Sequence, residues 1–146
     1  MSAWYNKSMA FPGTYNINYY KGDTYEFNVY PKNNDGTVFD LTSFVGEDLD
    51  PDTPGYQYAI FKFSTVRGTA GEANQHQCYA TISDNRTYIK CAIRPADGAL
   101  MTAGTSYVYD IQVQKSGTPY PIIYTLLTGT ITVTDQVTLD TIVVTP

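Results

Sequence analysis

The chain contains two cysteines, and both lie in the segment CYATISDNRTYIKC at residues 78–91. A two-residue turn at Asp84-Asn85 predicts a tight hairpin in which Cys78 lies directly opposite Cys91. In this register the apolar residues of both strands share one face, whereas a slip of one residue would scatter them. Three interpretations follow: two buried thiols acting as small apolar side chains, a cross-strand disulfide, or two ligands of a zinc ion. The first is favoured, because a cytoplasm keeps thiols reduced and zinc requires four ligands.

An acidic loop offers carboxylates at alternating positions, Asp48, Asp50 and Asp52. A calcium loop of the EF-hand type needs Gly at its sixth position and a bidentate acid at its twelfth. Those positions hold Thr53 and Ala59. A solvated acidic loop is therefore favoured over weak calcium binding.

The chain contains one histidine, His76, and the flanking Gly and Gln residues predict that it lies in a loop, exposed or hydrogen-bonded. No nucleophile stands beside it, so a Ser-His-Asp or Cys-His unit is not indicated. The two glycines of RGTAGEAN, residues 67–74, lack the following Lys-Ser/Thr of a phosphate loop. Carboxylates could still meet in three dimensions as in a glycosidase, but nothing in the sequence nominates a pair. We therefore expect no catalytic residue, no metal and no cofactor, and a protein that is not an enzyme.

The composition also excludes classes of partner. The 146 residues include only nine Lys and Arg, and the net charge is −5. Nucleic-acid binding requires clustered basic residues to neutralise phosphates, so nucleic acid is not an expected partner. No segment resembles a secretory signal or approaches the ~20 apolar residues of a membrane span. We expect no membrane partner and synthesis in a cytoplasm.

Alternating apolar residues and turn signals predict the elements that carry these residues. The predicted strands are 15–20, 24–30, 37–44, 56–65, 78–82, 88–93 and a long hairpin over 109–133, with one helical turn near 99–102. Seven to nine short strands indicate an all-β, immunoglobulin-like antiparallel β-sandwich. We assign it to residues 15–138, between an N-terminal arm of residues 1–14 and a C-terminal strand or arm of residues 139–146.

Both ends of the chain are too apolar to be inert solvated tails. Their apolar side chains are candidate inter-subunit contacts: Trp4, Tyr5, Met9, Phe11, Leu139, Ile142, Val143 and Val144. An extended segment can add a strand to the exposed edge of a sheet in a neighbouring subunit. The alternative is that both ends fold back on their own domain.

Three segments in succession resemble a known family. They are YYKGDTYEFNVYPKNNDGTVFDLTSF at 19–44, YIKCAIRPADGALMTAGTSYVYDIQVQ at 88–114 and YTLLTGTITVTDQVT at 124–138. This order resembles the small β-sandwich proteins of tailed bacteriophage virions, which occur in baseplate upper proteins, minor tail and long-tail-fibre proteins, and related head proteins. The resemblance covers about residues 15–138, and its short motifs are Tyr109-Asp110 and Leu126–Gly129.

The resemblance implies a structural role without catalysis. Such a protein occupies the virion, is assembled in the host bacterial cytoplasm, and contacts other virion proteins and copies of itself. A tail, baseplate or neck position is the first expectation, and decoration of the capsid surface is the second. A function of another class stays open, namely a carbohydrate-binding or adhesion module whose tyrosines (14 in the chain) stack on a host-surface glycan.

Overall fold

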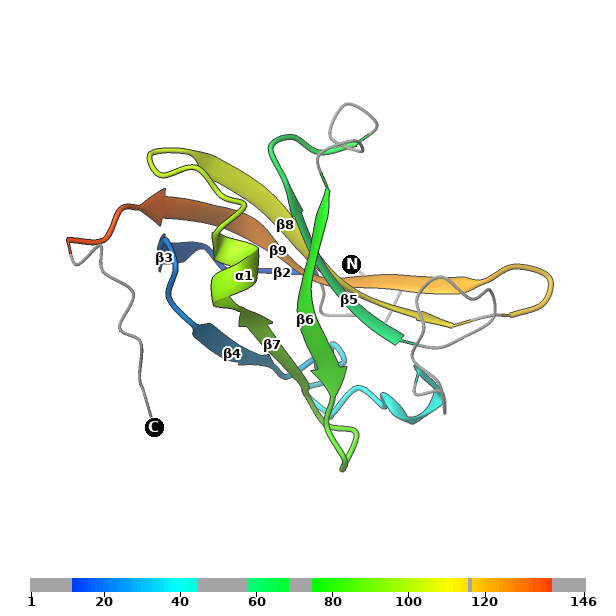
Figure 1. Ribbon diagram of the computed structural model, residues 1–146. Coiled ribbons are helices and arrows are strands. Elements are labelled where there is room, and N and C mark those ends of the chain that lie inside the picture. The colour runs from blue at the N-terminus through cyan, green and yellow to red at the C-terminus, as the bar shows by residue number, and fades with distance from the viewer. Residues whose placement is uncertain (1–11, 45–57, 69–74, 116, 138–146) are drawn as a thin grey trace.

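The computed structural model describes residues 12–44, 58–68, 75–115 and 117–137 (Figure 1). Its elements are β2 (Gly13–Thr14), β3 (Ile17–Tyr20), β4 (Tyr25–Val29), η1 (Thr42–Phe44), β5 (Tyr58–Ser64), β6 (His76–Ile82), β7 (Ile89–Ile93), α1 (Pro95–Gly98), β8 (Ser106–Lys115) and β9 (Ile122–Thr134). Strands dominate, and the two helical elements are single short turns. The predicted all-β class is confirmed.

The described strands form one eight-stranded sheet, in the order β2-β9-β8-β5-β6-β7-β4, with β3 also paired to β9. Most neighbours are antiparallel, but β2 and β3 run parallel to β9. The expectation of a purely antiparallel arrangement is therefore wrong for the first two strands. A long stretch of chain separates them from β9, so no tight turn forces the pairing to be antiparallel.

The sheet curls into a half-barrel because β6 belongs to both of its halves (Figure 1). Residues His76–Cys78 pair with β5, whereas Tyr79–Ile82 pair with β7. A strand that bends from one partner to the next turns a corner without interrupting the ladder. The described strands thus form one continuous curled sheet, and the predicted sandwich of two separate immunoglobulin-like sheets is not confirmed.

The core fills the inside of this curl. Aromatic rings from both halves meet there: the ring of Phe61 on β5 lies 5.7 Å from Phe27 on β4 and 5.4 Å from Tyr109 on β8. The largest fully buried side chains are Tyr19, Tyr109, Phe61, Ile17, Leu41, Ile89, Ile93, Met101, Ile111, Ile131, Val113 and Val133. Since strand residues alternate between faces, every second residue of β8 reaches this core.

The long hairpin predicted over 109–133 is confirmed as β8 and β9. Tyr107 pairs with Ile131 and Tyr109 with Gly129, and the register shifts once between Ile111 and Gln112. The alternation of the sequence therefore identified the strands and the inward face. It did not reveal the shift, at which the inward positions of β9 change from even-numbered residues up to Leu126 to odd-numbered residues from Gly129 on.

Two local predictions are wrong. Residues 37–44, predicted as a strand, form one isolated bridge between Lys32 and Val38 and then the 3₁₀ turn η1. The Asp40 carboxylate accepts the backbone N–H of Thr42, and such a side-chain bond competes with a strand ladder. The helical turn predicted near 99–102 lies instead at Pro95–Gly98, because proline favours the first position of a helix.

Several predicted features lie outside the described residues. These are the acidic loop residues Asp48, Asp50 and Asp52 and all eight candidate contact residues of the two arms. The described sheet begins at Gly13, so the last two residues of the predicted N-terminal arm belong to the sheet.

Candidate functional site

Asp97 is the most deeply buried charged side chain among the described residues, with 1% of its surface exposed. Three donors surround its carboxylate. Arg94 donates from its backbone N–H (2.9 Å) and its guanidinium (2.8 and 3.0 Å). The third is Nε2 of His76, 2.8 Å from Oδ1. This Arg94-Asp97-His76 cluster joins α1 to the first residue of β6.

The charge of Asp97 is stabilised by these partners. Burial alone would raise the pKa of the carboxyl, but the hydrogen bonds from Arg94 and His76 outweigh it and hold the pKa below its usual range. A buried carboxylate needs such compensation to stay ionised. The cluster therefore fastens α1 onto the sheet through charged hydrogen bonds, and every carboxylate oxygen already has a partner.

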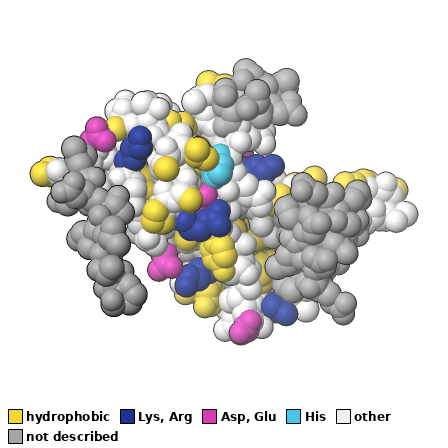
Figure 2. Space-filling model, in the orientation of Figure 1, with side chains coloured by type: hydrophobic (Ala, Val, Ile, Leu, Met, Phe, Trp, Pro, Cys, Tyr) yellow, Lys and Arg dark blue, Asp and Glu magenta, His cyan; other side chains and the backbone are white. Residues whose placement is uncertain are grey.

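His76 was predicted in a loop, and this is wrong, because it is the first residue of β6. The hydrogen-bonded state included in that prediction is confirmed by its contact with Asp97. Its ring also packs 5.4 Å from Phe63. In the space-filling view the histidine, in cyan, lies at the surface close to Lys and Arg side chains (Figure 2). Nothing in the sequence pointed to its carboxylate partner. Asp97 is the third residue of the turn that Pro95 begins, a position from which an acidic side chain can accept the backbone N–H of the preceding cap residue, Arg94.

The two cysteines share the inner face of the half-barrel, but they are not directly opposite. Cys91 pairs with Ala80, and Cys78 pairs with Phe61 of β5. The register therefore differs by two residues from the predicted one, which preserves the apolar face. Both thiols are free and buried.

The reason for the two-residue shift is the turn. Residues 84–87 form a four-residue loop in place of the predicted two-residue turn at Asp84-Asn85. The Ser83 hydroxyl accepts the backbone N–H groups of Thr87 and Tyr88, while the Ser83 backbone N–H donates to the Tyr88 carbonyl. Arg86 adopts φ 60°, a left-handed conformation that closes the loop.

The environment of the cysteines does not activate them. Burial raises the pKa of both thiols, and the nearby charge of Asp97 raises that of Cys78 further. A nucleophilic cysteine needs the opposite, a thiolate stabilised by a positive environment. Cys78 is therefore unsuited to act with His76 as a nucleophile and base.

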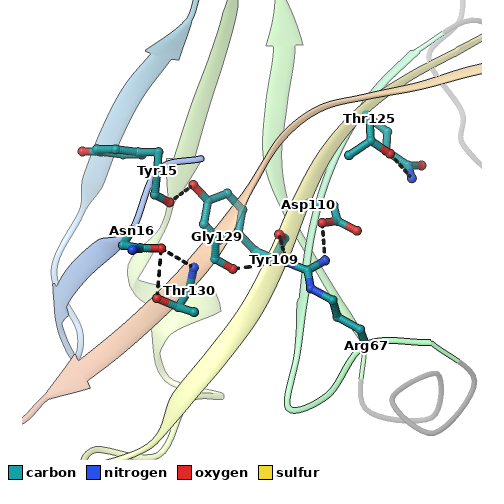
Figure 3. A network of polar contacts seen from close by, with 9 residues as sticks. Tyr15, Asn16, Arg67, Tyr109, Asp110, Thr125, Gly129 and Thr130 are labelled. Carbon is teal, nitrogen blue, oxygen red and sulfur yellow. Dashed lines mark hydrogen bonds and ion pairs between the residues drawn. The ribbon is translucent and has the colours of Figure 1, made fainter. Parts of the chain in front are cut away.

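A second polar network ties β8 and β9 to the start of the chain (Figure 3). Arg67, just after β5, contacts the Asp110 carboxylate and donates to the backbone carbonyls of Tyr109 (3.2 Å) and Gly129 (3.4 Å). At the other end, Asn16 accepts from the N–H and hydroxyl of Thr130, both at 3.2 Å. The residues of the short motifs at 109–110 and 126–129 thus hold strands together.

The edge of the half-barrel is the remaining candidate for function. Of the described strands, β4 pairs only with β7, so its other edge faces β2 across a groove. The groove has a volume of about 480 Å³, and its lining is mainly apolar. An unpaired strand edge presents N–H and C=O groups to any extended segment that fits it.

Two properties of the described residues bear on possible partners. They contain no group of three or more His, Cys, Asp or Glu side chains placed to hold a metal ion. Among the helices described, none has the length and apolar character needed to cross a membrane. In comparisons with known proteins, no family model and no curated protein matches the chain.

Proposed function

We propose that this chain is a non-enzymatic structural protein of a tailed-bacteriophage virion. It assembles in many copies through the edges of its sheet and at least one of its terminal arms. The observation that carries the proposal is the incomplete closure of the half-barrel, which leaves the outer edge of β4 unpaired among the described strands. Strand addition at such an edge gives affinity through main-chain hydrogen bonds and register through alternating side chains.

The use of the polar side chains supports a role without catalysis. Asp97, Arg94 and His76 are engaged with one another, and the thiol of Cys78 is buried with a raised pKa. The guanidinium of Arg67 likewise binds the Asp110 carboxylate and backbone carbonyls. Side chains with this chemistry hold elements in place, as a rigid building block requires.

We also propose that the curled sheet is an immunoglobulin-like sandwich whose two halves share β6. The two halves that meet at β6 face each other across one core, and Phe27 of one half packs edge-on against Phe61 of the other. A sandwich in which one strand is shared by both sheets has this arrangement. The family resemblance of residues 15–138 points the same way.

The partners follow from the same proposal: other virion proteins and further copies of the chain. The net charge of −5 disfavours the DNA inside the particle as a partner. A tail, baseplate or neck position is preferred, with decoration of the capsid surface as the second choice. Assembly takes place in the bacterial cytoplasm.

The experiment is a cryo-electron-microscopy map of particles purified from a producing host, combined with mass spectrometry of their proteins. We expect the chain in purified particles, at symmetry-related positions and in several copies. A second arm compares incorporation of the full chain with that of a variant lacking residues 139–146, which we expect to fold and to be excluded. Absence of the chain from purified particles contradicts the proposal, as does glycan binding by a chain that is never incorporated.

A further inference from the structure

The groove beside β4 has a defined floor and two walls. Leu126 and Leu127 of β9 form the floor, and Gly13 of β2 lies on one wall. The other wall contains Val29, the last residue of β4, and Tyr30, which follows it. We call this the β2–β4 groove. Most of its lining is apolar, and Tyr30 is 55% exposed at its rim.

The groove exists because two consecutive strands take different partners. β3 and β4 are joined by a short turn in which the Asp23 N–H donates to the Tyr20 carbonyl. Beyond that turn β3 pairs with β9 while β4 pairs with β7. No ladder joins β3 to β4 in the described part of the chain. The groove is therefore the seam at which the half-barrel stays open.

Among the described residues, the side chains that bridge the seam lie near one of its ends. The hydroxyls of Tyr15 and Tyr25 are hydrogen-bonded, and the ring of Tyr15 lies 5.5 Å from that of Phe27. Burial and the bond to Tyr15 raise the pKa of Tyr25 to about 12, so this bridge stays protonated at neutral pH. Towards Val29 the seam widens into the groove. The groove is open to solvent and mainly apolar, with a volume of about 480 Å³, so an apolar segment that docks in it removes apolar surface from water.

We propose that the N-terminal segment of the same chain, residues 1–11, docks in the β2–β4 groove and closes the seam. The first argument is position. The segment joins the sheet through Pro12, and the next residue, Gly13, is itself part of the groove wall. A tether this short gives the segment a high local concentration at the groove, which no separate partner shares.

The second argument is length and composition. Eleven residues reach up to ~36 Å when extended, whereas the five residues of β4 span only ~17 Å. The segment is therefore long enough to reverse and still cover the whole edge. It carries five large apolar side chains, counting Met1, and a single charged side chain, Lys7. This composition suits an apolar groove that is bordered by β4, a strand whose outer edge no other described strand pairs with.

The inference concerns the isolated chain, so it can fail while the virion proposal stands. Assembly through the edge of β4 then requires the N-terminal segment of one copy to give way to an arm of another copy, an exchange of segments between subunits. It also divides the roles of the two ends. With the N-terminal segment resting on its own domain, the C-terminal residues 139–146 remain to reach a neighbouring subunit.

The test is amide hydrogen exchange of the purified full chain against a variant lacking residues 2–11. We expect the β4 amides that point away from β7 to exchange at least ~10-fold faster in the truncated variant. A synthetic peptide of residues 1–11 added to that variant should restore slow exchange. Deletion of residues 138–146 serves as the control and should leave β4 unchanged. Equal exchange of β4 in the full chain and in the variant lacking residues 2–11 overturns the proposal.

Two further measurements keep the test decisive if the truncated chain does not fold. Full-length Leu127→Lys places a charge on the groove floor and should accelerate β4 exchange, whereas Ile123→Lys, on an exposed position of the same strand, should not. A triple variant with Trp4, Met9 and Phe11 changed to Ser should behave like Leu127→Lys. If these variants exchange like the unmodified chain, the proposal fails. It also fails if slow exchange disappears on dilution together with a dimer in sedimentation, since the occupant is then the segment of a second copy.

Discussion

The phenol of Tyr109 donates a hydrogen bond to the backbone carbonyl of Tyr15, joining the middle of β8 to the junction of β2 and β3 across 94 residues of sequence. Gly129 of β9 pairs with Tyr109 in the ladder and lies directly beneath this bond. A methyl group at position 129 would lie 2.0 Å from the same Tyr15 carbonyl. The glycine therefore provides the space that lets the first strands pair closely with β9.

Gly129→Ala should destabilise the fold strongly. The added Cβ meets backbone rather than a flexible side chain, so the parallel strands must shift. Overpacking of this kind costs ~1–3 kcal/mol of unfolding free energy, and the contact with backbone places the expected loss at the upper end. Urea denaturation followed by circular dichroism measures it. Gly13→Ala is the matched control, because its nearest atom would be Leu127 Cδ1 at 3.4 Å, and an equal loss in both variants would contradict the assignment.

Tyr109→Phe removes the hydroxyl while keeping the ring in the core. The Tyr15 carbonyl then loses a buried donor, and the expected cost is ~1–3 kcal/mol of unfolding free energy. Tyr120→Phe, which changes a 65% exposed tyrosine, should be close to neutral. A midpoint of urea unfolding that is unchanged in Tyr109→Phe would show that the bond does not stabilise the strands.

Asp97→Asn should weaken the attachment of α1 and alter the response to acid. The lowered pKa of Asp97 means that its stabilisation is complete above the unfolded-state pKa, ~3.9, and is lost as pH falls through the lower folded-state value. Near pH 7 we expect the variant to lose ~1.5–3 kcal/mol, as for hydrogen bonds to a charged group.

Urea unfolding measured at several pH values distinguishes the buried Asp97 carboxylate from a carboxylate at the surface. The difference in unfolding free energy between the unmodified chain and Asp97→Asn should shrink progressively below pH 4. Asp110→Asn, which breaks the partly exposed pair with Arg67, should cost under ~1 kcal/mol. If both variants lose the same free energy at pH 7, burial of Asp97 has no energetic role.

Cys78 and Cys91 should resist alkylation in the folded protein. Both thiols are buried, and burial raises the pKa of each, so neither forms the reactive thiolate near pH 8. Intact-mass measurement after iodoacetamide treatment should show no adduct in native buffer and two adducts in denaturant. The exposed position Ser106, changed to Cys, gives the matched control and should add one adduct in native buffer. A mass lower by two hydrogens without reductant would instead reveal a disulfide.

The local sequence was sufficient to predict pairs of strands that are joined by a short connection. The alternation of Tyr107, Tyr109, Ile111 and Val113 marks the inward face of β8, and the hairpin to β9 follows it. Asn, Asp and Gly likewise mark the turn that ends in Gly36, whose φ of 88° suits glycine. In each case the information lies within a few residues of the feature.

The same alternation could not fix the register of β6 and β7. A shift of two residues returns every side chain to the same face, so Cys91 opposite Ala80 satisfies the apolar pattern as well as Cys91 opposite Cys78. The observed register is fixed by the Ser83 hydroxyl, which accepts hydrogen bonds from two backbone N–H groups and so stabilises a loop of four residues. Side-chain capture of backbone groups leaves no periodic signal in the sequence.

The sequence by itself determined the all-β class, the inward faces and the main hairpin, because these depend on a two-residue period and on turn residues. Only the tertiary structure decided that Ile17 lies beside Ile131, that β6 serves both halves of the sheet, and that Asp97 meets His76. Each of those contacts joins residues far apart in the chain or turns a corner within a strand. They form because burying the shared core outweighs the entropy of bringing distant segments together, and that balance is settled by the whole fold.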